Sequence, residues 1–140
     1  MYPKKIIKQI RILPTSSTDY DFKDEESMKN FFTIKLPSNG KFHFFKNNVA
    51  DPEGTLILFQ YNNSIVASGI MESRHDKTEQ GYNGYYIFNK DSINLLATPI
   101  SKDELRNADV GFERFGNVSK KIDINHFRKI NNLLDKHFED

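Results

Sequence analysis

The chain has 140 residues, which is enough for one domain with a hydrophobic core of its own. It contains no cysteine, so disulfide bonds, thiol catalysis and cysteine-ligated zinc are excluded, in agreement with a reducing compartment. Its formal net charge is only +1, whereas a protein that binds nucleic acid through bulk charge is strongly basic. Any nucleic-acid site must therefore be local.

No stretch of the sequence is apolar over the length of a secretory signal or a membrane span. We therefore expect one cytoplasmic domain that covers residues 1–140. Charge is distributed unevenly, because residues 1–50 carry nine Lys and Arg against five Asp and Glu, while residues 51–100 carry three against six. The result is a basic N-terminal arm, either a solvated face or a contact surface, formed by Lys4, Lys5, Lys8 and Arg11.

The first third of the chain predicts a strand, a helix and a second strand. Residues 6–13 alternate loosely between apolar and polar side chains, and Pro14 ends this strand. Residues 25–32 follow a polar stretch that contains capping residues, and they predict a short helix. Residues 37–40 (Pro-Ser-Asn-Gly) are typical of a turn, after which residues 41–45 predict the next strand.

The clearest pattern is a β-hairpin. Residues 55–61 and 64–72 are strand-like and flank residues 62–63 (Asn-Asn), a dipeptide that tolerates the positive φ angles of a tight turn. The first strand is nearly all apolar, which indicates burial on both of its faces. In the second strand, Gly69 indicates either a bulge or a close approach of another segment.

The second half of the chain predicts two more strands and two helices. Residues 85–88 and 92–97 are strand-like and follow a polar excursion at residues 74–84. Ser101 and Glu104 match a capping box that begins a short helix. Asp123 then caps a helix over residues 124–138, whose apolar stripe is formed by Phe127, Ile130, Leu134 and Phe138, with Leu133 beside it.

This order of elements predicts an α+β fold, in which most strands are antiparallel and the helices lie at the margins. We expect a small, mostly antiparallel β-barrel with two or three flanking helices.

The sequence offers little support for catalysis. The four histidines are His43, His75, His126 and His137, and no two have the i, i+4 spacing that places two metal ligands on one helix face. Gly81 and Gly84 lack the lysine and hydroxyl residue of a phosphate-binding loop. No pair of groups suited to acid–base work is evident. We therefore expect no metal, no cofactor, no catalytic residues and no enzymatic activity.

Residues 54–121 resemble the PUA-like group of small barrels, which includes the ASCH, EVE and SRA-type modules. The resemblance lies in the turn at residues 51–54 that opens a buried strand, in the hairpin that ends at Gly69, and in the strand pair of residues 84–88 and 93–100. It implies a module that binds DNA or RNA without catalysis, in some cases as the reader of a flipped or modified base held between aromatic rings. The alternative is a protein-interaction module of a larger restriction or defence assembly, docked through the apolar stripe of the C-terminal helix.

Two segments supply candidate nucleic-acid contacts. In residues 111–121, Phe112 and Phe115 would stack on bases and Arg114 would contact phosphate, with the backbone held by Ser119, Lys120 and Lys121. The other interpretation also stays open: both rings pack beneath the C-terminal helix, since burying one Phe side chain stabilises the fold by about 1.5–3 kcal/mol.

The second segment is the tyrosine-rich excursion. Its candidate residues are Tyr82, Tyr85 and Tyr86 with Arg74 and Lys77. A tyrosine combines a flat apolar face with a polar tip, which suits a half-hydrated pocket. Adjacent strand residues point to opposite faces, so only one of Tyr85 and Tyr86 can face the same site as Tyr82. For each tyrosine, the alternative is packing against a neighbour in the sheet.

Overall fold

A computed structural model describes residues 1–16, 19–46 and 49–138 of the chain. Residues 17–18, 47–48 and 139–140 of the expected domain lie outside this described part.

The strands are β1 Gln9–Pro14, β2 Lys41–Phe44, β3 Thr55–Tyr61, β4 Ser64–His75, β5 Gly84–Phe88, β6 Asn94–Ser101 and β7 Lys120–Ile122. The helices are α1 Glu25–Asn30, α2 Leu36–Asn39, α3 Lys102–Asn107 and α4 Phe127–Phe138, and a π-helical segment, Phe31–Lys35, joins α1 to α2. Short 3-10 turns lie at Lys4–Ile6 (η1), Tyr20–Phe22 (η2), Lys90–Ser92 (η4) and Ile124–His126 (η5). Within the described ranges, no helix is long and apolar enough to cross a bilayer.

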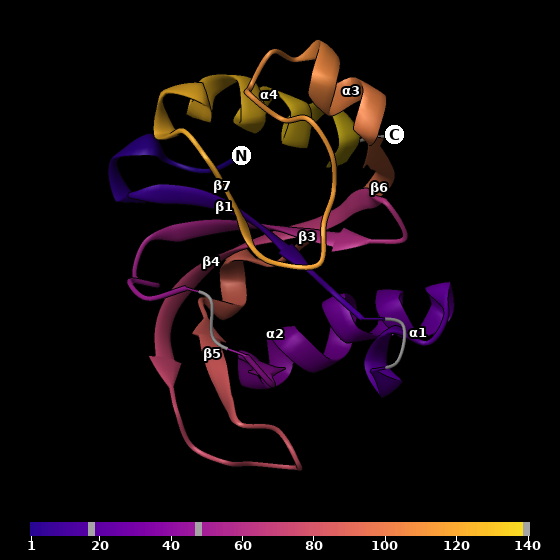
Figure 1. The fold of residues 1–140 in the computed structure, drawn as a ribbon, viewed down its shortest axis with the longest axis vertical. Helices are drawn as coiled ribbons and strands as arrows, with labels where there is room; N and C mark the ends of the chain where they lie inside the picture. The colour runs from indigo at the N-terminus through magenta and orange to yellow at the C-terminus, as the bar shows by residue number, and fades with distance from the viewer. Residues whose placement is uncertain (17–18, 47–48, 139–140) are drawn as a thin grey trace.

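All seven strands belong to one sheet, with helices on both of its faces (Figure 1). The strand order is β2-β5-β4-β3-β1-β7, and β6 pairs with the first half of β4. Only the β1–β3 pair is parallel, so the expected α+β class and the mostly antiparallel pairing are confirmed. The order is open from β2 to β7, and these two strands do not pair in the described part of the chain. Closure into a barrel is therefore not confirmed.

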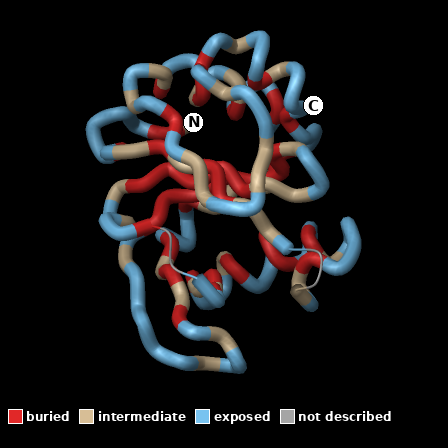
Figure 2. The backbone as a smooth tube through the Cα atoms, viewed as in Figure 1, coloured by how far each residue is buried: buried red, intermediate tan, exposed pale blue. Residues whose placement is uncertain are grey.

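Strand β3 lies at the centre of the sheet and is covered on both faces. Alternate side chains of a strand point to opposite faces, and here both sets are apolar. Leu56 and Leu58 point into a first core, whereas Ile57 and Phe59 point into a second core on the opposite face. Figure 2 shows the buried sheet between the two helical layers. The prediction that this strand is buried on both faces is confirmed.

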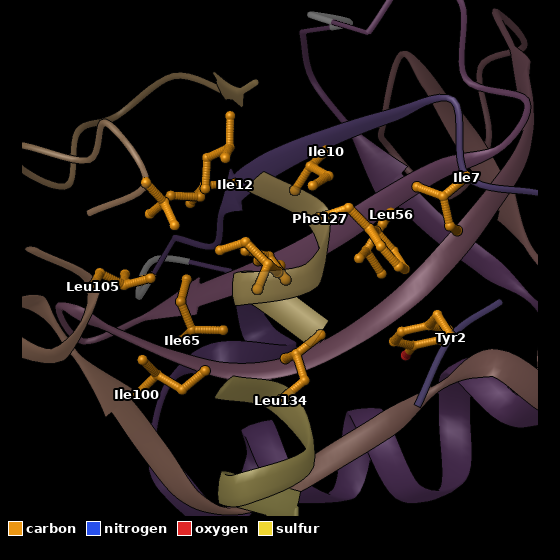
Figure 3. Close-up of a cluster of buried hydrophobic side chains, with 14 of the residues drawn as sticks. Tyr2, Ile7, Ile10, Ile12, Leu56, Ile65, Ile100, Leu105, Phe127 and Leu134 are labelled. Carbon is orange, nitrogen blue, oxygen red and sulfur yellow. The ribbon is translucent and has the colours of Figure 1, made fainter. Parts of the chain in front are cut away.

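The first core lies between the sheet and helices α3 and α4 (Figure 3). Phe127, Ile130 and Leu134 of α4 are buried there together with Leu105 of α3. The predicted stripe is thus confirmed except at Phe138, which stands at the end of α4 and is 43% exposed. Because the stripe packs against the chain's own sheet, it is not free to serve as the docking face of the alternative interpretation.

The second core is dominated by phenylalanine rings. It lies between the other face of the sheet and the continuous helical segment from α1 to α2. Phe31 and Phe32 of this segment meet edge to face, with ring centroids 5.2 Å apart, and Phe32 packs on Phe59 of β3 at 4.7 Å. Offset and edge-to-face pairs of this kind stabilise the fold beyond the burial of their area. Much of the aromatic content of the chain therefore fills this core.

The β3–β4 hairpin is confirmed, and so is the role of its special residues. Asn62 and Asn63 have φ angles of 51° and 60°, as a tight hairpin turn requires. Gly69 marks a close approach, because a Cβ atom there would lie 2.7 Å from the Cδ1 atom of Ile93. The bulges of β4 lie elsewhere, between Ile65 and Ala67 and between Met71 and Ser73.

Two features differ from the expectation. Residues 37–40 are not a free turn, because Pro37 lies in the first turn of α2, where its missing N–H is tolerated. Gly40 ends the helix in a left-handed conformation with φ of 72°, and the helical segment predicted for residues 25–32 consequently runs on to Asn39. Strand β7 was not anticipated, since three residues carry no usable periodicity.

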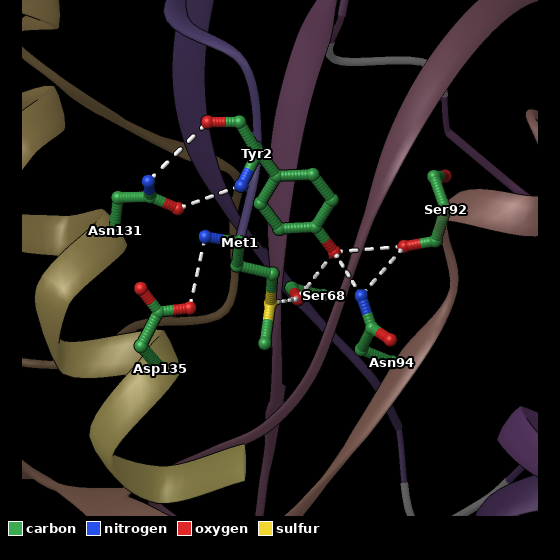
Figure 4. Close-up of polar contacts among 7 residues, drawn as sticks. All are labelled: Met1, Tyr2, Ser68, Ser92, Asn94, Asn131 and Asp135. Carbon is green, nitrogen blue, oxygen red and sulfur yellow. Dashed lines mark hydrogen bonds and ion pairs between the residues drawn. The ribbon is translucent and has the colours of Figure 1, made fainter.

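The N-terminal residues are built into the fold (Figure 4). The buried Tyr2 hydroxyl donates to the Ser92 carbonyl at 2.7 Å, lies 2.7 Å from Ser68 Oγ, and accepts a hydrogen bond from Asn94 Nδ2 at 3.0 Å. Burial raises the pKa of Tyr2. The amino group of Met1 forms an ion pair with Asp135 of α4 at 2.9 Å. These contacts connect the N-terminus to β4, to β6 and to α4.

We predict that Tyr2→Phe lowers the free energy of unfolding by about 1–3 kcal/mol, because buried polar partners lose their hydrogen bonds while the ring volume is kept. Urea denaturation followed by circular dichroism measures this loss. Tyr61→Phe is the matched control, since the Tyr61 hydroxyl has no hydrogen bond in the described part of the chain. Equal stability of both variants would contradict the role of the Tyr2 network.

Helices α3 and α4 are joined by a buried histidine. His137 Nδ1 lies 3.0 Å from both Oγ1 and O of Thr98, and its Nε2 contacts the Glu104 carboxylate at 2.5 Å. Glu104 also closes the predicted capping box with Ser101. Desolvation raises the pKa of Glu104, but the hydrogen bond to His137, the Ser101 N–H and nearby positive charge outweigh it, so the pKa lies below the usual value.

We predict that this contact makes stability acid-sensitive. Since the pKa of Glu104 is lowered on folding, its contribution is complete above the usual glutamate value of 4.5 and is lost as the pH falls through the folded-state pKa. The difference in Tm between the native chain and Glu104→Gln should therefore be largest at neutral pH and shrink below pH 4.5. Glu26→Gln, at an exposed position in α1, is the control for the loss of one carboxylate, and its Tm difference should depend less on pH than that of Glu104→Gln.

Candidate nucleic-acid interface

A hollow of about 600 Å³, which we call the aromatic pocket, opens at the edge of the second core. Six segments of the chain meet there: the end of β1 with the residues after it, η2 with Asp19, strand β2 with the residues after it, the 74–84 excursion, strand β5, and the loop before β7. Its lining residues are Leu13, Pro14, Thr15, Ser16, Asp19, Tyr20, Phe22, Phe42, His43, Phe44, Phe45, Lys46, Tyr82, Tyr86, Asn117 and Val118.

The pocket combines a buried apolar floor with an exposed apolar rim. Phe22, Phe42 and other buried residues that line it belong to the second core. Six large apolar side chains are exposed in the described part of the chain, and three of them stand on this rim. They are Tyr20, Phe45 and Val118, exposed to 73%, 61% and 58%. Apolar groups gathered around a hollow are typical of a binding surface.

Tyr82 forms one wall of the pocket. Its ring packs against Phe45 at a centroid distance of 4.7 Å and against His43 at 5.2 Å. Its hydroxyl donates to Asp19 Oδ2 at 2.8 Å, while Asp19 Oδ1 accepts from the backbone N–H of Asp21 and so caps η2. Burial and the hydrogen bond to Asp19 raise the pKa of Tyr82, so the hydroxyl stays protonated and donating.

The excursion that carries Tyr82 is held against strand β2. Glu79 Oε2 lies 2.7 Å from His43 Nε2, and its carboxylate accepts from Lys41 Nζ at 3.0 and 3.1 Å. These hydrogen bonds, the one to His43 first, keep the pKa of Glu79 below its usual value. Asn83 adds two hydrogen bonds, from its N–H to the Phe44 carbonyl and from Nδ2 to the Phe45 carbonyl. Tyr82 is therefore positioned by its neighbours on both sides.

The other residues predicted on the excursion have different environments. Tyr86 is 1% exposed, so its ring belongs to the second core and is not available for stacking with a base. Tyr85 points to the opposite face, where its ring stacks on His75 at 5.1 Å and lies 4.5 Å below Lys41 Nζ. Arg74 forms an ion pair with Asp76 at 3.4 Å, and Lys77 is exposed.

The loop at residues 111–121 is partly structural. Phe112 and Phe115 contact each other at 4.8 Å and are half-buried against the first core, which agrees with the packing interpretation for both rings. Three side chains fasten the loop through its backbone carbonyls: Arg106 Nε donates to Glu113 at 2.6 Å, Gln60 Nε2 donates to Gly116 at 3.1 Å, and Lys120 Nζ donates to Arg114. Ser119 Oγ accepts from Arg11 at 3.2 Å.

Arg114 and Lys121 remain exposed, and their side chains have no hydrogen-bond or ion-pair partner in the described part of the chain. Lys121 and Arg74 line a second, polar hollow of about 660 Å³ together with Lys8. The same hollow also contains Asp51, Glu53 and Glu72, so its charges largely cancel. The residues predicted as one site are thus divided between the aromatic pocket and other surfaces.

Of the sixteen residues that line the aromatic pocket, the sequence analysis predicted only Tyr82 and Tyr86 as site residues. Those that it missed include Asp19, Tyr20, Phe45 and Val118. For Phe45 a signal existed, because Phe42 and Phe44 point into the core and the next residue of an alternating pattern points outward. The other three lie in the 3-10 turn η2, at its N-cap and in the loop before β7, and no local pattern connects these segments to β2. Among the described residues, no group of three or more His, Asp and Glu side chains is arranged to hold a metal ion.

No protein-family model matches the sequence, and no curated protein matches it. Solved structures do match the fold. The ASCH protein from Zymomonas mobilis aligns with 89% of this chain and 95% of its own, with a TM-score of 0.56 and 9% identity. The N-terminal domain of McrB from Thermococcus gammatolerans, bound to m5C DNA, aligns with 92% of this chain and 98% of its own, with a TM-score of 0.54 and 12% identity. Both are PUA-like domains.

The chain has a PUA-like fold. The predicted resemblance is confirmed at this level, and the match extends beyond residues 54–121 to about nine-tenths of the chain. At identities of 9% and 12% the likeness concerns the PUA-like fold alone, so no residue role is transferred from either neighbour.

We predict that Arg114 of the loop and Arg106 of helix α3 differ in their effect on stability. Arg114→Ala should leave Tm unchanged, because the side chain is exposed and unpaired among the described residues. Arg106→Ala should lower the free energy of unfolding by roughly 0.5–1.5 kcal/mol, since it releases the Glu113 carbonyl. Thermal denaturation of both variants measures the difference, and a large drop for Arg114→Ala would assign its side chain to the fold instead.

Proposed function

We propose that this chain is a DNA-binding module that holds one base, flipped out of the stack, in the aromatic pocket. The observation that carries the proposal is the convergence of three exposed apolar side chains on one hollow of a PUA-like fold. It is supported by the McrB N-terminal domain, a neighbour in fold that is bound to m5C DNA.

The energetics of base flipping favour this pocket. Extruding a base costs a few kcal/mol, which stacking on aromatic side chains offsets by about 1–3 kcal/mol per base. The rings of Tyr20 and Phe45 stand on the rim, and buried Phe side chains form the floor. A volume of about 600 Å³ lies within the range of roughly 300–1,000 Å³ that is usual for ligand pockets.

The polar groups of the pocket suggest which base it holds. The Asp19 carboxylate accepts from Tyr82 and from the Asp21 N–H, and a carboxylate has further lone pairs for a third donor. A base with an exocyclic amino group supplies such a donor, whereas a carbonyl in the same place is repelled. A methylated cytosine would place its amino group at Asp19 and its methyl group against the apolar walls. The pocket therefore favours cytosine and its 5-methyl derivative over thymine.

Phosphate contacts would come from a small number of local cations. Lys46 lies at the pocket, and Arg114 and Lys121 are exposed on the loop region that also supplies Asn117 and Val118. Each neutralised phosphate adds about −0.9 to the slope of log affinity against log salt for duplex DNA. Three contacts would give a slope of about −3, which is modest and suits a net charge of +1.

The proposal includes no catalysis, because His43 and Asp19 are held by Glu79 and Tyr82 in contacts that position the pocket wall. These hydrogen bonds hold the shape of the site. In this proposal the base is recognised by stacking on the aromatic rings and by one hydrogen-bond acceptor, the Asp19 carboxylate.

We predict that Phe45→Ala weakens binding to m5C-containing DNA about 5- to 100-fold, as expected for the loss of one stacking surface. Fluorescence anisotropy with labelled oligonucleotides at two salt concentrations measures the change. Phe138→Ala is the matched control, because Phe138 is also an exposed phenylalanine but lies at the end of α4. Absence of binding to plain and methylated DNA at low salt would end the proposal.

A further inference from the structure

A third hollow adjoins the aromatic pocket on the other side of Tyr82. It also has a volume of about 600 Å³, and we call it the flanking hollow. It lies between the α1–α2 segment, strand β2 and the turn of the 74–84 excursion. Its lining residues are Tyr20, Asp21, Phe31, Ile34, Lys35, Ser38, Asn39, Lys41, His43, Gln80 and Tyr82. Tyr20, His43 and Tyr82 line both hollows, so a single layer of side chains separates them.

The charges of the flanking hollow are internally balanced. Lys35 Nζ donates to Asp21 Oδ1 at 2.6 Å, and Lys41 Nζ donates to the Glu79 carboxylate at 3.0 Å. The Lys35–Asp21 hydrogen bond raises the pKa of Lys35, so the Lys35 ammonium keeps its charge beside the Asp21 carboxylate. A site whose cations are already paired is a poor phosphate site. It suits an uncharged ligand with polar edges.

Apolar surface and unused hydrogen-bonding groups face this hollow together. Ile34 is 58% exposed and, with Tyr20, is one of the large apolar side chains that the fold leaves uncovered in the described part of the chain. The amide of Gln80 has no hydrogen-bond partner among the described residues, and Asn39 uses only its Oδ1, which accepts from the Lys41 N–H. A flat apolar surface beside free amide groups is what stacks on a heteroaromatic ring and reads its edge.

We propose that the flanking hollow holds a second nucleobase, the one next to the base in the aromatic pocket. This inference rests on the proposed function and deepens it. The ligand is then a pair of adjacent unpaired nucleotides that straddles the Tyr82–Asp19 hydrogen bond, with one base on each side. One nucleotide step links the two bases across the single shared layer of side chains. The preferred substrate is then single-stranded or locally opened DNA with two adjacent unpaired nucleotides, which binds more tightly than a duplex with one extruded base.

The test compares DNA duplexes that contain no unpaired nucleotide, one, or two adjacent ones, together with a single strand, at one salt concentration. The duplex with two unpaired nucleotides should bind about five-fold or more tightly than the duplex with one, since a second base gains a stacking surface. Ile34→Ser should remove this gain and leave binding of the one-nucleotide duplex unchanged. Phe45→Ala should weaken every complex.

Ile6→Ser is the matched control, because Ile6 is an isoleucine that is also exposed and lines neither hollow. Equal affinity for one and two unpaired nucleotides would overturn the second base site while leaving the proposed function intact. So would an equal loss of affinity for both ligands in Ile34→Ser. If none of the oligonucleotides binds, the proposed function is wrong, and the proposal of a second base site in the flanking hollow is wrong with it.

Discussion

The structure depends on one constraint: strand β3 must be covered on both faces at once. Every residue from Thr55 to Phe59 is buried, so neither face tolerates solvent. Helix α4 covers one face and the α1–α2 segment covers the other, which forces the chain to supply two cores from 140 residues. Burial of this apolar area, at about 25 cal/mol per Å², is the main driving force that holds both helical layers to the sheet.

The aromatic pocket arises where the second core ends. Phe22, Phe42 and Phe44 belong to that core and also line the pocket, so the pocket floor is part of the core. The rim is different, because Tyr20 and Phe45 leave most of their surface in water. Exposed rings contribute little to the stability of the fold. Packing of the core therefore explains the buried aromatic residues of the chain but not Tyr20 and Phe45. The hydrogen bond from Tyr82 to Asp19 fixes the Tyr82 ring, which forms the wall between the buried floor and the exposed rim.

What the sequence predicted correctly was local. The hairpin at Asn62 and Asn63 and the capping box at Ser101 each depend on a few consecutive residues, and both were found. The turn expected at residues 37–40 failed because a proline also begins a helix, and the choice was decided by burial of Leu36 in the second core. Tyr82 was predicted as a site residue, but its partners in the pocket were not, because the pocket joins Tyr82 to Tyr20 and Val118, and no local pattern records which distant segments meet.

The charge distribution explains why such a module would bind DNA mainly through contacts to bases and less through contacts to the phosphate backbone. The chain carries 20 basic and 19 acidic residues, and the cations nearest the flanking hollow are paired with Asp21 and Glu79. The net charge of the chain is only +1, so long-range attraction to phosphates would contribute little to affinity. Under the proposed function, one ligand would be distinguished from another by the exposed surface of the rings and the single acceptor of Asp19, and these would act only on a base that has already left the stack. Selectivity would therefore follow the ease with which the DNA opens as well as the identity of the base, because an opened site has already met the unstacking cost of a few kcal/mol.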